Sequence, residues 1–196
     1  MNIKIAVIIG SIRPNRVGDK IGNWFMNQVK NIEGVEFSLI DLSSENLPFL
    51  NEPDLPANGN YQQSSTKKWA EKIIQYDGFV FVVPEYNHGY APALKNAVDT
   101  LYKEWAKKPV AFIGYGSLGG VRAVEQLVQV TAQINMVPLP STQINIIDIW
   151  SAVNEDGDLN TNNIRGTIEK LLDNLLWWAK LLKNARNTEN SNKVLA

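Results

Sequence analysis

Cysteine is absent from this chain of 196 residues, and histidine occurs only once, at position 88. Without cysteine there are no disulfides, no thiolate nucleophiles, no iron–sulfur clusters and no cysteine-ligated zinc. The single His88 excludes metal sites built from several histidines, whereas sites made of carboxylates stay open. These absences remove the thiol and multi-histidine classes of active site before any motif is considered.

Neither sign of charge dominates, because 19 Lys and Arg stand against 20 Asp and Glu and leave a net charge of −1. There is no basic excess to attract nucleic acid and no strong acidity of the kind that serves charged docking. The longest uncharged stretch, 126–147, contains Gln, Asn and Pro, and the apolar run Ile5–Ile9 is too short for a signal sequence. We therefore expect a soluble cytoplasmic protein of one domain that binds neither nucleic acid nor membrane.

Patterns of buried strands alternate along the chain with helical patterns. Strands are expected at 3–9, 35–42, 79–83, 110–115 and 143–149. Helices are expected at 17–29, 66–76, 93–105, about 120–134 and 162–182. This alternation predicts an α/β fold with a doubly wound, five-stranded parallel sheet in three layers. The domain should span 1–183 and be followed by a frayed polar tail, 184–196.

Two features of the connections add detail to this plan. The polar stretch 43–65 is long for a connection inside a domain, and such loops are usually functional or mobile. Ser65 or Thr66 is the expected N-cap of the helix that follows. Ligands of doubly wound sheets bind outside the carboxyl ends of the strands, so the loops after the first, third and fourth strands are the places to look for a site.

The first of these loops, 10–18, runs from a strand directly into a helix N-terminus, where free N–H groups and the helix dipole favour an anion. Ser11 adds a hydroxyl, and Arg13 and Arg16 add planar donors that match phosphate oxygens. The alternative is that both arginines are solvated charges on an ordinary turn. Their coincidence at the expected ligand edge favours a site for a phosphate monoester, although Asp19 repels a phosphate unless it points away.

The other two loops have weaker signals of their own. Pro84–Pro92 offers backbone N–H groups, the Asn87 amide and two tyrosine rings to a flat heterocycle, or it is simply a turn with packed tyrosines. The segment 114–120 contains a literal G-x-G-x-x-G, but it follows the fourth strand and has no acidic residue about 20 positions on. We therefore reject a dinucleotide-binding fingerprint here and expect a glycine turn against which a planar group can lie.

Taken together, the three loops resemble those of the NADPH-dependent FMN reductase family, which has the flavodoxin-like fold. The matching residues are Gly10-Ser11-Ile12-Arg13 with Arg16, Pro84-Glu85-Tyr86-Asn87, Pro92-Ala93-Leu94-Lys95-Asn96-Ala97-Val98-Asp99, and Tyr115-Gly116-Ser117 with Gly119-Gly120. The similarity runs in order over about 1–183. One departure is His88, which stands where many relatives carry a larger aromatic residue.

The resemblance implies a cofactor and a set of ligands for it. Ser11, Arg13 and Arg16, with the backbone of Val17, would hold the FMN phosphate. Pro84, Glu85, Tyr86 and Asn87 would line the ribityl chain and the ring. Tyr115, Gly116 and Ser117 would close the other edge of the ring.

The resemblance also implies an activity and an assembly. The expected reaction transfers hydride from NADPH or NADH through FMN to a small-molecule acceptor, either a quinone, an azo compound or free flavin. The family usually forms homodimers or homotetramers with flavin sites near the subunit interface. No catalytic side chain is expected, and His88 more often packs or forms hydrogen bonds than transfers a proton.

Two other functions stay open. An electron-carrier flavodoxin without NAD(P)H activity has the same fold and cofactor, but such carriers are typically acidic, and the arginines of the first loop argue against it. A phosphate-binding or regulatory domain of this fold class without flavin is the second alternative.

Overall fold

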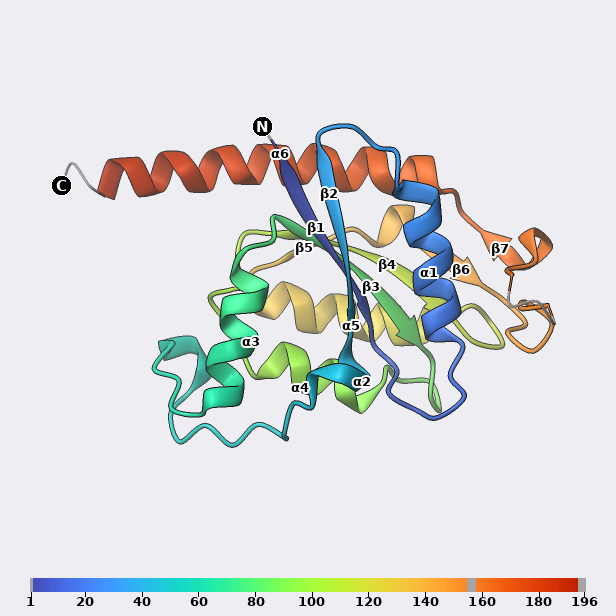
Figure 1. Ribbon diagram of the computed structural model, residues 1–196, viewed down its shortest axis with the longest axis horizontal. Coiled ribbons are helices and arrows are strands. Elements are labelled where there is room, and N and C mark those ends of the chain that lie inside the picture. The colour runs from blue at the N-terminus through green and yellow to red at the C-terminus, as the bar shows by residue number, and fades with distance from the viewer. Residues whose placement is uncertain (1, 155–157, 194–196) are drawn as a thin grey trace.

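The computed structural model describes residues 2–154 and 158–193 and is built on one twisted, mostly parallel sheet (Figure 1). Its strands are β1 (Ile3–Ile9), β2 (Val35–Asp41), β3 (Gly78–Pro84), β4 (Pro109–Tyr115), β5 (Val137–Pro138), β6 (Ile144–Ile146) and β7 (Ile164–Arg165). The order across the sheet is β2-β1-β3-β4-β6-β7, with β5 also paired to β4. The predicted α/β class and the doubly wound parallel order are confirmed.

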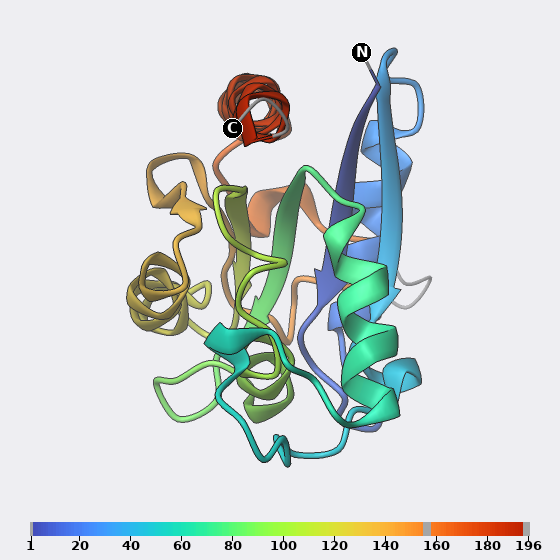
Figure 2. The same cartoon turned by 90° about the vertical axis from the view of Figure 1, so that its left-hand side faces the viewer.

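Helices cover both faces of the sheet and give the predicted three layers (Figure 2). The helices are α1 (Gly18–Val29), α2 (Leu42–Glu45), α3 (Ser64–Ile74), α4 (Pro92–Asp99), α5 (Val121–Gln133) and α6 (Ile168–Lys193). α1 and α6 pack on one face with Ile5 and Val7, whereas α3, α4 and α5 pack on the other with Ala6 and Ile8. Because both faces are covered, β1, β3 and β4 are apolar at nearly every position rather than at alternate ones.

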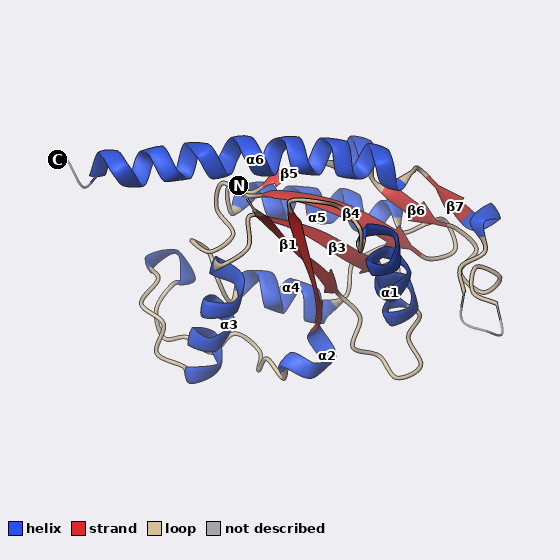
Figure 3. Ribbon diagram, turned by 45° about the horizontal axis from the view of Figure 1, so that its top comes forward, coloured by secondary structure: helices blue, strands red, loops and turns tan. Residues whose placement is uncertain are grey.

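The expected fifth strand at 143–149 is shorter in the structure, where β6 covers only Ile144–Ile146, and β5 at Val137–Pro138 is a separate strand that was not expected. β5 pairs with the start of β4, and β6 pairs with its end. A 3-10 turn at Pro140–Thr142 separates the two, and Pro138 and Pro140 supply no N–H for a continuous ladder. β7 adds an antiparallel strand beyond β6, at the far end of the sheet from β2 (Figure 3).

α4 ends at Asp99, although we expected it to reach Trp105. Trp105 is fully buried and packs edge-on against Phe79, with 4.8 Å between the ring centroids. Its indole N–H donates to the carbonyl of Val98, and the indole of Trp69 donates to that of Ala97. Both carbonyls would accept bonds from the next turn of a longer helix, so burial of the two indoles ends α4 early.

The connection before α3 also differs from expectation. The helix begins at Ser64 with Gln63 as its N-cap, so the predicted cap at Ser65 or Thr66 is wrong. The carboxylate of Glu52 accepts hydrogen bonds from the backbone N–H groups of Gln62 and Gln63, at 2.6 and 3.0 Å. A side chain from the long loop itself therefore holds the start of α3 in place.

α6 is the longest helix and differs from the expected range at both ends. The segment before it forms a 3-10 turn at Thr161–Asn163 and then β7, so the helix begins at Ile168 rather than at 162. At the other end the polar residues from 184 onward continue the helix to Lys193 instead of fraying. Residues 194–196 of the predicted tail lie outside the described residues, and the division of the chain at 183 stays a prediction.

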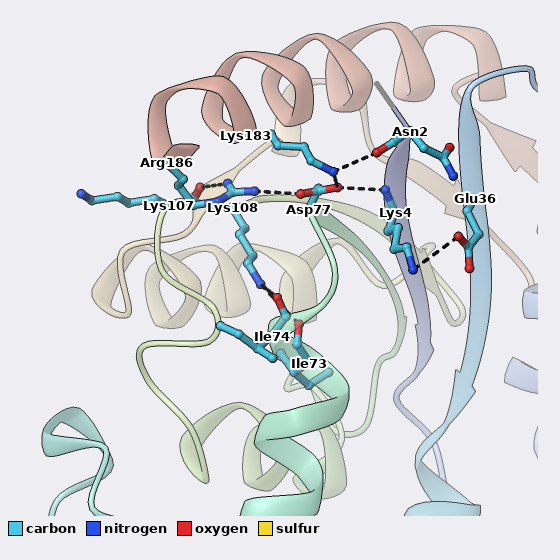
Figure 4. A network of polar contacts seen from close by, with 10 residues as sticks. All are labelled: Asn2, Lys4, Glu36, Ile73, Ile74, Asp77, Lys107, Lys108, Lys183 and Arg186. Carbon is cyan, nitrogen blue, oxygen red and sulfur yellow. Dashed lines mark hydrogen bonds and ion pairs between the residues drawn. The ribbon is translucent and has the colours of Figure 1, made fainter. Parts of the chain in front are cut away.

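Asp77 fastens α6 to the edge of the sheet where the strands begin (Figure 4). Its carboxylate is 9% exposed and accepts from Lys183 Nζ at 2.6 Å and from Arg186 Nη2 at 3.0 Å. It also accepts the backbone N–H of Lys4 in β1, at 3.0 Å. Arg186 donates in addition to the carbonyl of Lys107 at 2.6 Å. These contacts explain why the polar end of α6 stays helical against the protein. No helix of the described residues is long and apolar enough to cross a membrane.

Lys108 is a buried amine beside this network. Its side chain reaches the carbonyls of Ile73 and Ile74 at the end of α3, at 3.3 and 3.0 Å. Burial lowers the pKa of Lys108 from 10.5 to about 7, and the Arg186 guanidinium acts in the same direction. When the Lys108 amine is charged, it donates to these two carbonyls at the C-terminal, negative end of the α3 dipole.

We expect Lys108→Met to change how stability depends on pH. The folded pKa lies below the unfolded one, so the unfolded chain binds more protons between about pH 7 and 10.5, and Lys108 makes stability rise with pH in that window. One proton corresponds to a slope of at most about 1.4 kcal/mol per pH unit. Urea unfolding from pH 7 to 9.5 should show a flatter rise in Lys108→Met, whereas Lys180→Met, an exposed α6 control, should follow the parent chain. Parallel profiles for all three proteins would contradict this account.

Candidate functional site

The three loops singled out in the sequence leave adjacent strands at one edge of the sheet. β3 lies between β1 and β4, with Ile9 opposite Val82 and Pro84 opposite Tyr115 in the parallel registers. Loop 1 (10–17) follows β1, loop 2 (85–91) follows β3 and loop 3 (116–120) follows β4. Parallel pairing therefore brings together three segments that are about 75 and 30 residues apart in sequence.

Loop 1 presents hydrogen-bond donors that have no protein acceptor. In the described part of the chain, the backbone N–H groups of Ile12, Arg16 and Val17 donate to no protein atom. Val17 is the N-cap residue of α1 and offers no side-chain cap. The Arg13 side chain is exposed and forms no ion pair with a described residue. An anion placed here would meet these N–H groups and the positive end of the α1 dipole.

Arg16 is placed differently from Arg13. Its guanidinium pairs with the carboxylate of Asp41, at the end of β2, while its Nε is buried and has no partner. Asp19, in the first turn of α1, pairs with neither arginine, and its Oδ1 is also buried without a partner. The pairing of Arg16 leaves Arg13 without an ion-pair partner among the described residues and available to an anion, whereas Asp19 is the opposing charge in this region.

These features fit the phosphate of a mononucleotide. Arg13, the unpaired Nε of Arg16 and three free amide N–H groups are charged and neutral donors of the kind that phosphate oxygens accept. The predicted contact of Ser11 with the phosphate stays a prediction, and in the structure this buried side chain bonds a tyrosine. Its Oγ lies 2.5 Å from the hydroxyl oxygen of Tyr86 and accepts the N–H of Arg13 at 3.4 Å. Ser11 thus links loop 1 to loop 2.

Loop 2 is a tight turn that exposes its tip. Tyr86 and Gly89 exchange both backbone hydrogen bonds, at 2.8 and 3.0 Å. Asn87 and His88 between them have positive φ, +50° and +71°, as the central residues of a type I′ turn do. Asn is among the residues that tolerate this conformation best, and both side chains are exposed at the edge of the sheet.

Glu85 joins loop 2 to α5 rather than pointing freely into the site. Its carboxylate is 6% exposed, pairs with the guanidinium of Arg122 and accepts the backbone N–H of Arg122 at 3.2 Å. The tip of loop 2 is held as well: Arg122 Nη1 lies 2.7 Å from His88 Nε2, and Gln126 donates to the carbonyl of His88 at 2.9 Å. The first two turns of α5 therefore hold loop 2 at its start and at its tip.

Loop 3 closes tightly through glycine. Gly120, the N-cap residue of α5, has φ +70°, and a Cβ there would lie 2.5 Å from the backbone nitrogen of Tyr115. Asn145 in β6 donates to the carbonyl of Gly119 at 2.8 Å. The G-x-G-x-x-G of this segment thus forms a compact strand-to-helix turn, in agreement with its interpretation as a glycine turn.

The Tyr115 side chain is buried against the start of α1. Its hydroxyl is so close to Gly18 that a Cβ at that position would lie 2.7 Å from it. Burial raises the pKa of Tyr115, and Tyr86 adds to the effect, so the hydroxyl stays protonated. Of the predicted third group, Gly116 is buried and Ser117 is exposed.

The structure places all the predicted site residues at one edge of the sheet, where some are exposed and others join loops or helices. Arg13, Asn87 and Ser117 are exposed there, Pro84 ends β3, and Val17 starts α1. Ser11, Glu85, Tyr86 and Tyr115 connect loops to each other or to helices. Their roles as FMN ligands stay predictions. Sequence reasoning missed Asp41, Arg122 and Gln126, although Asp41 ends a predicted strand and Arg122 starts a predicted helix at this same edge.

Beside loop 1 lies a hollow of about 400 Å³ between that loop, α2 and the start of α4. Most of its lining is apolar and includes Ile12, Leu47, Pro48 and Ala93. A hollow of this size is within the range of small-molecule sites.

Comparison with known proteins places these features in a family. The model of the NADPH-dependent FMN reductase family matches residues 3–150, which contain all three loops. An NAD(P)H-dependent FMN reductase of Schizosaccharomyces pombe is 41% identical over 140 residues, covering 70% of each chain. An NAD(P)H:quinone oxidoreductase of Solanum tuberosum is 30% identical over 177 residues, covering 87% of this chain and 89% of the relative.

The fold is also similar to that of solved structures. FerB, described as a flavoenzyme NAD(P)H:(acceptor) oxidoreductase from Paracoccus denitrificans, superposes with a TM-score of 0.69. The match covers 93% of this chain and 98% of that protein at 22% sequence identity. At this identity the likeness supports the arrangement of strands and helices, and at 93% coverage it extends into the part of the chain beyond residue 150.

The close packing of loop 3 predicts a large cost for Gly120→Ala. The new methyl group would clash with the Tyr115 backbone and force a positive φ on alanine, so we expect a loss of roughly 2–5 kcal/mol in unfolding free energy. Gly34→Ala is the matched control, because Gly34 has φ +74° with no atom within 4 Å of the added Cβ. It should lose only about 1–2 kcal/mol. Equal losses in urea unfolding would show that loop 3 is not tightly packed.

Proposed function

Because the chain belongs to the NADPH-dependent FMN reductase family, we propose that it oxidises NADPH or NADH with bound FMN and reduces a quinone, an azo compound or free flavin. The observation that carries this proposal is the set of unmatched donors in loop 1, at the start of α1. The quinone reductase among the relatives supports a small organic acceptor.

Each part of the edge has a task in this proposal. Arg13, the Nε of Arg16 and the amides of Ile12, Arg16 and Val17 hold the phosphate. Tyr86 and Asn87 of loop 2 line the ribityl chain and ring, and Gly116 and Ser117 border the far edge. When bound there, FMN supplies the hydride chemistry, and the chain supplies position and electrostatics. The apolar hollow beside Ile12 offers space for part of a second substrate.

No side chain of the three loops is proposed to act as an acid or a base in hydride transfer. The Glu85 carboxylate is committed to Arg122, and burial keeps the Tyr115 hydroxyl protonated. We propose that the protein contributes by holding two flat groups in contact and by placing N–H donors where negative charge develops.

Membership in a reductase family argues against the electron-carrier alternative. It also argues against a phosphate-binding domain that lacks flavin. The near-neutral charge of the chain agrees with the first of these two exclusions.

Assembly and location complete the proposal. We infer a homodimer or a homotetramer, supported by large exposed side chains such as Phe49 and Trp150, each 79% exposed, and Trp177, 59% exposed. A cytoplasmic location follows from the reductant, because NAD(P)H is held inside cells. Light scattering of the purified protein measures the subunit number.

Arg13→Ala should weaken FMN binding about ten- to a hundredfold, because a charged hydrogen bond of about 1.5–3 kcal/mol is lost. Quenching of FMN fluorescence on titration into the apoprotein measures the change. Lys180→Ala, which removes an exposed positive charge on α6, should bind FMN like the parent chain. Unchanged affinity in Arg13→Ala would contradict the assignment of the phosphate to loop 1.

Steady-state kinetics separate an enzyme from an electron carrier. If the nicotinamide cofactor and the acceptor occupy the same space in turn, initial rates at varied NADPH and quinone should give parallel double-reciprocal lines. Intersecting lines would mean that both substrates bind together. An FMN-loaded protein without NAD(P)H oxidation would support the electron carrier instead.

A further inference from the structure

One side chain of α5, that of Arg122, contacts loop 2 at two points. Arg122 pairs with Glu85 at the start of the loop, and its Nη1 lies 2.7 Å from the Nε2 of His88 at the tip. Glu85 is nearly buried and packs against Gly116, where an added Cβ would lie 3.3 Å from the Cβ of Glu85. Arg122 therefore links the tip of loop 2, its base and loop 3.

The chemistry of the two partners determines which tautomer of His88 this contact requires. A guanidinium has only donors and stays charged, so the atom facing Arg122 Nη1 must accept a hydrogen bond. Nε2 of His88 can accept only in the neutral imidazole whose proton is on Nδ1. Arg122 and Gln126 are the α5 side chains that contact His88, and Glu85, from the loop of His88 itself, faces the same guanidinium. Arg122 and Glu85 are the charged groups of this set, and of the two Arg122 is the one within hydrogen-bond distance of the ring.

Protonation of His88 would remove the acceptor and place two positive charges in contact. The imidazolium and the guanidinium would repel each other, whereas Glu85 would keep its ion pair with the guanidinium. The tip of loop 2 is the part that would move away from Arg122, because His88 is exposed and Glu85 is not. Asn87, the neighbouring residue of the turn, would move with it.

We propose that His88 is a positioning residue, whose neutral Nδ1–H form holds the tip of loop 2 against Arg122, and whose protonation releases that tip and weakens FMN binding. The last step rests on the proposed function, since it takes loop 2 to border the flavin. The contact and tautomer themselves do not depend on FMN.

The tautomer is tested directly by ¹⁵N NMR, because His88 is the single histidine of the chain. In protein labelled with ¹⁵N-histidine at pH 8, we expect a protonated Nδ1 and an unprotonated Nε2. Arg122→Gln should shift the spectrum toward a mixture of tautomers. An Nε2–H tautomer in the parent protein would overturn the proposal.

The consequence for FMN is tested by titrations of the apoprotein at pH 8 and pH 5.5. The phosphate group of FMN also changes charge near pH 6, so His88→Asn serves as the reference, since it keeps that effect and removes the imidazole. Asn is chosen because it tolerates positive φ. The parent chain should lose roughly three- to tenfold more affinity between the two pH values than His88→Asn does. Equal losses would overturn the proposal.

Arg122→Gln is a second variant in case His88→Asn does not fold. It removes the positive charge that opposes an imidazolium, so the additional loss at pH 5.5 should disappear in it as well. An additional loss that persists in Arg122→Gln would overturn the proposal. Absence of FMN binding at pH 8 would instead contradict the proposed function, and the NMR result would then decide the His88–Arg122 contact by itself.

Discussion

Parallel pairing of β1, β3 and β4 is the constraint on which the site depends. It places three loops at the carboxyl edge, and burial of the strands on both faces fixes the register. The loops are then fastened to one another by side chains. Ser11 and Tyr86 join loop 1 to loop 2, and Glu85 with Arg122 joins loop 2 to the start of α5. The site is therefore largely preformed, because contacts within the protein hold its loops in place.

Positively charged side chains have carboxylate partners at one edge of the sheet and lack some of their partners at the other. At the edge where the strands begin, Lys183 and Arg186 both meet the buried carboxylate of Asp77. At the other edge Arg13 has no partner among the described residues, and Arg16 keeps one buried N–H unpaired. The ion pairs with Asp77 stabilise the attachment of α6, whereas donors without partners at a helix N-terminus attract an anion. This difference indicates a structural role for the first edge and supports the proposal that the second binds a ligand.

The parts of the fold that follow from local pattern were predictable. Strands such as Phe79–Val83 are continuous apolar runs, and their order along the chain indicates a parallel sheet. The end of α4 was not predictable, because it depends on where the Trp69 and Trp105 indoles find acceptors in the folded core. The polar end of α6 looked like a tail because its anchors, Asp77 and the Lys107 carbonyl, are about 80 to 110 residues away in sequence.

The site, like the fold, was predictable only in part. The loops and the donors of loop 1 were identified from residue type and position relative to strands and helix starts. Which side chains face the ligand was not, because Glu85 and Tyr115 turn toward α5 and α1 only once the loops are packed. Arg122 carries no motif of its own, and its importance becomes visible through contacts with two residues of loop 2.

A crystal structure of the protein grown with FMN tests the central claim most directly. The account predicts the phosphate within hydrogen-bond distance of the Arg13 side chain and of the backbone N–H groups of Ile12 and Val17, with the ring between loops 2 and 3. FMN bound elsewhere, or a phosphate turned away from the start of α1, would contradict it.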